Sequence, residues 1–95
     1  GKIKLTSLES IEFKNVCFRY DKAKEDVLKN ISFRVEKGEN IGIIGSSASG
    51  KTTIINLLLR HIDATSGEIL INGINITEYD LESLRSIFAY TPQKP

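Results

Sequence analysis

A short apolar run, a loop of small residues and an apolar helical segment follow one another between residues 40 and 62. Residues 40–44 are apolar on both faces, as a buried parallel strand requires. Residues 51–62 are long enough for a helix and apolar around much of its circumference, so we expect that helix to be largely buried. The loop between them fits the pattern G-x-x-x-x-G-K-[ST]. This order predicts a strand–loop–helix unit in an α/β fold.

The residue types in the loop suit the binding of a polyphosphate. Small side chains let the backbone N–H groups turn inward, and the amino end of the following helix directs its dipole at the same anion. Lys51 adds a positive charge that can reach the β- and γ-phosphates, and Thr52 offers a hydroxyl to Mg²⁺. The alternative is a glycine- and serine-rich connector without a ligand. The predicted phosphate-binding residues are Gly45, Ser46, Ser47, Ala48, Ser49, Gly50, Lys51, Thr52 and Thr53.

Alternating patterns predict further strands on both sides of this unit. Residues 11–20 alternate with a change of phase at Asn15, which indicates a bulge or a break, and residues 27–35 alternate again. Residues 68–71 form another strand, followed by a tight turn at residues 72–73 and an extended segment at 74–76. Gly67 is expected to close the end of the preceding helical region.

The last part of the chain is expected to hold a short helix and a strand. Asp80 is a candidate N-cap for a helix that carries Leu81, Leu84 and Arg85, and residues 87–90 are predicted to form the final strand.

Composition excludes several functional classes. Thirteen Lys and Arg residues against twelve Asp and Glu leave a net charge of +1, so no basic surface for nucleic acid is expected. No run of eighteen apolar residues is present that could cross a bilayer. Cys17 is the only cysteine, so an internal disulfide is excluded. A free cysteine usually packs as a small hydrophobic residue, and we expect this of Cys17.

Several ordered blocks, together with the loop, resemble the N-terminal part of an ATP-binding cassette (ABC) nucleotide-binding domain, closest to the exporter type. The resemblance covers residues 11–95, and residues 1–10 read as a linker. Besides the phosphate loop, it is carried by IEFKNVCFRY at 11–20, VLKNISF at 27–33, SGEILING at 66–73 and YTPQ at 90–93. It implies a P-loop NTPase core fragment with an antiparallel β-subdomain, ending just after the glutamine of the Q-loop.

The resemblance also implies roles for single residues, with ATP and Mg²⁺ as ligands. Tyr20 would stack on the adenine ring. Gln93 would be the Q-loop glutamine, which touches Mg²⁺ and the attacking water. Lys51 and Gln93 are therefore the expected catalytic residues of this segment, and Thr52 and Gln93 the expected metal contacts.

The expected partners follow from the same resemblance. They are a membrane-spanning transporter domain and a second nucleotide-binding domain, at the cytoplasmic face of a membrane, with no nucleic acid. The signature motif, the catalytic glutamate and the switch histidine of the family lie beyond the Q-loop. The 95-residue segment alone is therefore expected to bind ATP–Mg²⁺ weakly, to turn over almost none of it, and to self-associate through the open edge of the strand at residues 41–44.

The resemblance implies the ATP-binding segment of an exporter that couples ATP hydrolysis to transport across a membrane, and two other functions remain open from the sequence. One is a soluble ABC ATPase without a membrane partner, and the other is a non-catalytic nucleotide-binding piece.

Overall fold

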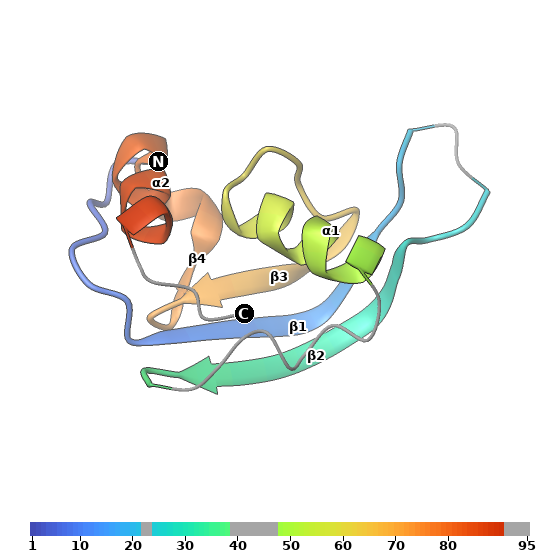
Figure 1. Cartoon of the computed structure of the whole chain (residues 1–95), viewed down its shortest axis with the longest axis horizontal. Helices are drawn as coiled ribbons and strands as arrows, with labels where there is room; N and C mark the ends of the chain where they lie inside the picture. Colours follow the sequence, from blue (N-terminus) through green and yellow to red (C-terminus); the bar gives the residue numbers. More distant parts are fainter. Residues whose placement is uncertain (22–23, 39–47, 91–95) are drawn as a thin grey trace.

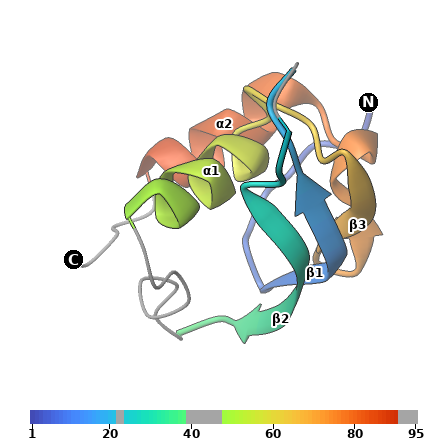
Figure 2. The ribbon, with the colours of Figure 1, turned by 90° about the vertical axis from the view of Figure 1, so that its right-hand side faces the viewer.

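The computed structural model describes residues 1–21, 24–38 and 48–90, with the side chains of Ala48, Ser49 and Tyr90 left aside. Two helices lie on one face of a twisted sheet (Figure 1, Figure 2). The described elements, in chain order, are β1 (Ser10–Phe18), β2 (Leu28–Glu36), α1 (Ala48–Leu58), β3 (Ser66–Ile71), β4 (Ile74–Asn75), the 3₁₀ turn η2 (Ile76–Glu78) and α2 (Leu81–Tyr90). The expected α/β class and antiparallel β-subdomain are confirmed, whereas the strand expected at residues 40–44 lies outside the described residues.

The sheet has the strand order β2-β1-β3-β4, and its pairs are all antiparallel. β1 pairs with β2 on one side and with β3 on the other. Its apolar residues alternate, so their side chains share one face of the sheet. Phe13 is opposite Phe33 on β2, and the two rings stack with centroids 4.5 Å apart. The apolar face of β1 therefore forms the centre of the core.

Asn15 lies at an irregularity in β1, as the change of phase in the sequence predicts. The register of β1 shifts between Phe13 and Val16 against β2. Asn15 has a φ of 51°, and its backbone N–H donates to Ser32 Oγ at 2.9 Å. The extra residue restores the inward direction of Val16, which is fully buried.

The bulge at Asn15 dictates the residue at position 67 of the neighbouring strand. Gly67 has a φ of +84°, and a Cβ atom added there would overlap the carbonyl of Asn15. Gly67 therefore serves β3 rather than the end of the preceding helix, which corrects the expectation for this glycine. Glycine is required at this position because the backbones of β1 and β3 approach closely there and leave no room for a Cβ atom.

α1 ends earlier than the apolar pattern suggests. Arg60 has a φ of 56°, its N–H donates to the Leu57 carbonyl at 3.1 Å, and the N–H of His61 donates to the Asn56 carbonyl at 2.9 Å. These two bonds are a Schellman closure, which stops the helix at Leu58. The helix expected to reach residue 62 is thus shorter, because its later apolar residues belong to the connection toward β3.

α2 begins as predicted and ends differently. Asp80 caps it, since its Oδ2 accepts the N–H of Ser83 at 2.9 Å. The strand predicted at residues 87–90 is wrong, because these residues continue α2 to Tyr90. Leu84 and Phe88 are both buried, and their spacing of four places them on the same face of a helix. Helical periodicity therefore accounts for the apolar residues that suggested a strand.

Residues 2–5 lie against η2 and the start of α2 (Figure 1). The Ile3 carbonyl accepts the N–H of Asp80 at 2.7 Å, and the N–H of Leu5 donates to Ser83 Oγ at 3.0 Å. Leu5 is buried in the core, and Lys4 lies 3.3 Å from the Asp80 carboxylate. The segment therefore packs on the domain, whatever its role as a linker in a longer chain.

Gly67→Ala should destabilise the fold by about 2 kcal/mol or more, because it adds a backbone overlap to the strain of a positive φ. Gly73→Ala is the matched control: Gly73 has a φ of +80° but open space around its Cβ position. The control should cost about 1 kcal/mol. Urea denaturation measures both, and equal losses in the two variants would contradict the close contact with Asn15.

Asp80 should make stability depend on pH. The N–H of Ser83 and then Lys4 hold the pKa of Asp80 below its ordinary value. A carboxylate with a lowered folded pKa stabilises the fold above its unfolded pKa of about 4 and loses that contribution as the pH falls through the folded pKa. The stability difference between the wild type and Asp80→Asn should therefore be constant from pH 7 to about 5 and shrink below about 4.

Thermal denaturation at a series of pH values measures this difference. Lys4→Ala is the matched variant, because it removes the weaker cause and keeps the Ser83 bond, so most of the pH dependence should persist. A difference that grows on acidification would contradict the assignment.

Candidate nucleotide-binding site

The second half of the phosphate-loop motif forms the amino end of α1. Gly50, Lys51 and Thr52 belong to its first turns, and the helix that the motif is expected to open is present. The backbone N–H groups at a helix start have no partner within the helix ladder and carry its positive dipole end. The first turn contains no acidic residue that would compete with an anion. Gly45, Ser46 and Ser47 lie outside the described residues.

Burial differs among the three motif residues that follow Gly50. Lys51 and Thr52 are exposed, whereas Thr53 is 2% exposed. The ammonium group of Lys51 can therefore meet a ligand from solvent. Thr53 is instead buried, so its side chain contributes to the packing of the helix rather than to a surface open to solvent.

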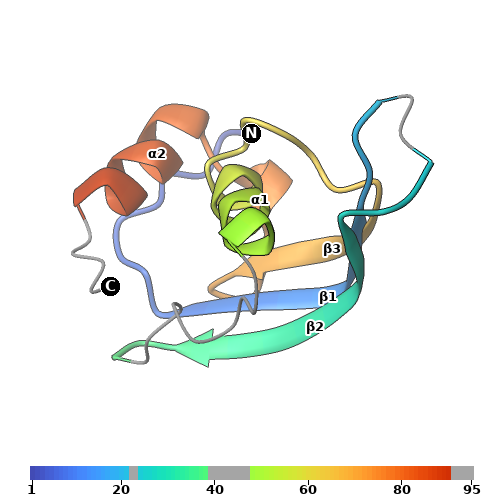
Figure 3. The same cartoon turned by 45° about the vertical axis from the view of Figure 1, so that its right-hand side comes forward.

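α1 is held in place by the core beneath it. Ile54, Leu57 and Leu58 are buried and belong to the same apolar cluster as Phe13 and Ile69 of the sheet. Figure 3 shows α1 lying across the strands. This packing determines where the amino end of the helix points, because a helix with a buried face cannot rotate without exposing it.

Tyr20 lies in the connection between β1 and β2. It is 48% exposed, and its ring meets Phe18 edge-on, with centroids 4.8 Å apart and an interplanar angle of 84°. Phe18 is buried, so one edge contact orients a ring that stays open to solvent. The position of Tyr20 relative to the amino end of α1 stays a prediction.

Of the two predicted metal contacts, Thr52 and Gln93, only Thr52 lies among the described residues. No group of three or more His, Cys, Asp or Glu side chains that could hold a metal occurs among residues 1–21, 24–38 and 48–90. Mg²⁺ bound to a nucleotide needs only one or two protein ligands, so an exposed Thr52 hydroxyl at the helix start fits it. Gln93 lies outside the described residues.

Sequence patterns missed the contact between Arg85 and the carboxyl end of α1. Arg85 Nε donates to the Leu59 carbonyl at 2.8 Å, and its Nη2 donates to the Arg60 carbonyl at 3.2 Å. The one available hint is that the last turn of α1 contains no basic residue of its own. That hint does not identify the partner, because Arg85 lies about 25 residues further along the chain.

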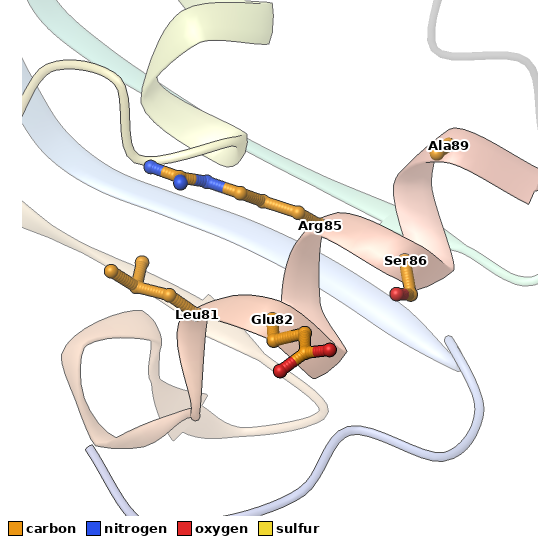
Figure 4. A pocket seen from close by; sticks show the side chains of 5 residues that line it. All are labelled: Leu81, Glu82, Arg85, Ser86 and Ala89. Atoms are coloured by element: carbon orange, nitrogen blue, oxygen red, sulfur yellow. The ribbon is translucent and has the colours of Figure 1, made fainter.

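The outer face of α2 carries a hollow of about 500 Å³ (Figure 4). It is lined by Leu81, Glu82, Arg85, Ser86 and Ala89. None of the residues predicted to bind nucleotide lines it.

Neither helix in the described ranges is long and apolar enough to span a membrane.

Comparison with known proteins decides the family. The family model described as "ABC transporter" matches residues 28–95. The chain belongs to the ABC transporter family. This family implies nucleotide binding, in agreement with the motif at the start of α1.

The relatives of this ABC chain include named exporters. It is 48% identical over 84 residues to the ATP-dependent lipid A-core flippase of Pasteurella multocida, with 88% of this chain covered. It is 43% identical over 76 residues to a putative multidrug export ATP-binding/permease protein of Bacillus subtilis, with 80% of this chain covered. These matches place it among ATP-binding parts of the exporter type.

A solved structure supports the fold. A bacterial Atm1-family ABC exporter with ATP bound matches with a TM-score of 0.71 and 33% identity, and the match covers 87% of this chain. The chain spans only 14% of that exporter and 14% of the flippase. It therefore corresponds to a small part of these proteins.

Proposed function

We propose that this chain is the ATP-binding segment of an ABC exporter that couples ATP hydrolysis to transport across a membrane. The observation that carries the proposal is the position of Gly50-Lys51-Thr52, the end of the motif. These residues lie at the amino end of α1, and one face of this helix is buried in the core. An exposed lysine, an acid-free first turn and the positive end of the helix dipole together suit a polyphosphate.

Each site residue has a distinct role in this proposal. The backbone of residues 45–53 surrounds the phosphates, and Lys51 neutralises charge on the β- and γ-phosphates. The Thr52 hydroxyl contacts the Mg²⁺ that accompanies ATP as substrate. Tyr20 stacks on adenine, a role supported by its half-exposed ring, which contacts Phe18 edge-on.

The chemistry of hydrolysis is mainly positioning and charge stabilisation. Lys51 and Gln93 are the catalytic residues that this segment contributes: Lys51 stabilises charge on the transferred phosphoryl group, and Gln93 orients the attacking water beside the metal. Removal of a proton from that water needs a general base, which is neither Lys51 nor Gln93. Binding is therefore the activity to test on the 95-residue chain.

The proposed partners are a membrane-spanning domain and a second nucleotide-binding domain, at the cytoplasmic face of the membrane. The names of the relatives, a flippase and an export permease, favour transport over a soluble ABC ATPase. The ATP bound in the related Atm1-family exporter supports the ligand.

Lys51→Ala should raise the Kd for ATP–Mg²⁺ by about tenfold or more, because a hydrogen bond to a charged group contributes about 1.5–3 kcal/mol. Titration with a fluorescent ATP analogue measures the Kd. Lys14→Ala removes an exposed lysine from β1 and is the control, for which no change is expected. Equal affinity of the two variants would refute the proposed site.

Tyr20→Ala should weaken ATP binding by about fivefold, since stacking contributes about 1 kcal/mol, and Tyr20→Phe should restore it. Inorganic tripolyphosphate has no base to stack, so its affinity should be the same in all three proteins. Calorimetric titration of both ligands measures the contrast. A loss of tripolyphosphate binding in Tyr20→Ala would contradict a role confined to the adenine ring.

A further inference from the structure

Arg85 joins the two helices at one point. Its side chain leaves α2 toward the chain that follows α1 (Figure 4), where it donates to the carbonyls of Leu59 and Arg60. Two donors of one rigid guanidinium reach two consecutive carbonyls, which specifies the orientation of the side chain as well as its position. The contact is partly buried and spans 26 residues of sequence.

The contact lies at the negative end of the α1 dipole. The last turn of α1 has no basic residue, and the guanidinium of Arg60 is engaged with Asp63 at 3.1 Å. Arg85 therefore supplies from another helix the positive charge that α1 lacks at its carboxyl end. The opposite end of α1 carries Lys51 and the proposed phosphate site.

α1 can transmit a displacement from one end to the other. Its 11 residues form a rod of about 16 Å, whose buried residues Ile54, Leu57 and Leu58 contact the core. A small movement of the amino end on binding an anion therefore moves the carboxyl end, since a closely packed helix shifts as a unit.

α2 is attached to other parts of the chain at its beginning. Asp80 and Ser83 are bonded to the segment that carries Ile3 and Leu5. α2 ends at Tyr90, three residues before Gln93. A movement received through Arg85 thus reaches a helix that is connected both to residues 1–10 and to the expected Q-loop.

We propose that Arg85 is a positioning residue that couples nucleotide binding at the amino end of α1 to the stability of α2. The inference rests on the proposed function, because it requires that ATP–Mg²⁺ binds at α1. In this proposal Arg85 does more than cap a helix: its guanidinium links the presence or absence of nucleotide at α1 to the stability of α2, the helix that precedes Gln93.

Hydrogen–deuterium exchange of the 95-residue chain with and without ATP–Mg²⁺ tests the coupling. Each protein is held at a nucleotide concentration of about 50 times its own measured Kd, so that all are saturated. In the wild type, nucleotide should slow exchange in α1 and, by about threefold or more, in α2. In Arg85→Ala the slowing should remain in α1 and be lost in α2.

Conservative and control variants separate coupling from a loss of structure. Arg85→Lys retains the charge without the fork, so it should recover part of the α2 response. Ser86→Ala, on the exposed side of the same helix, should behave as the wild type. If Arg85→Ala does not fold, Arg85→Gln replaces it with the same expected loss, since a neutral amide removes the charge and one of the two bonds.

The outcomes distinguish the two proposals. Slowing in α1 without slowing in α2 of the wild type, or an α2 response that persists in Arg85→Ala or Arg85→Gln, overturns the coupling and leaves nucleotide binding intact. No binding and no slowing anywhere in the wild type overturns the proposed function, and the coupling with it. A purely structural role would lower the melting temperature of the Arg85 variants while leaving the nucleotide response of α2 unchanged.

Discussion

The double pairing of β1 is the constraint on which the other elements depend. With β2 on one side and β3 on the other, β1 presents the buried side chains of Ile11, Phe13 and Val16 to the helices. α1 packs on this surface through Leu57 and its neighbours. The direction of the amino end of α1, and with it the position of Lys51, therefore follows from strand register. A slip of one residue would turn every inward side chain of β1 to solvent.

α1 has two chemically different ends, and the fold treats them differently. At the amino end the exposed Lys51 and an acid-free first turn keep positive potential available to a ligand. At the carboxyl end the Schellman bonds and the guanidinium of Arg85 satisfy carbonyl groups within the protein. The amino end thus carries an exposed lysine, while the carboxyl end is bonded to α2 through Arg85. This asymmetry is the physical basis for assigning the site to the amino end.

Local signals were read correctly where one side chain decides the backbone. The change of phase at Asn15 predicted the bulge, and Asp80 predicted the start of α2. Errors arose where two periods fit the same residues. Residues 87–90 are apolar enough for a strand, yet Leu84 and Phe88 also match a helical face, and burial of that face prevailed. The sequence suggests a helix end at Gly67, because the residue that actually requires a glycine there, Asn15 with its carbonyl, is distant in sequence.

The amino-acid sequence by itself determined the phosphate motif, the helix that follows it and the alternation of β1, because each depends on neighbours along the chain. Only the tertiary structure decided that α1 stops at Leu58, that Arg85 reaches the Leu59 carbonyl, and that Leu5 is buried. These contacts join residues far apart in sequence, and their free energy exists only once the sheet has brought the partners together. The contact of Tyr20 with Phe18 was likewise decided by the tertiary structure, which leaves the tyrosine half-exposed.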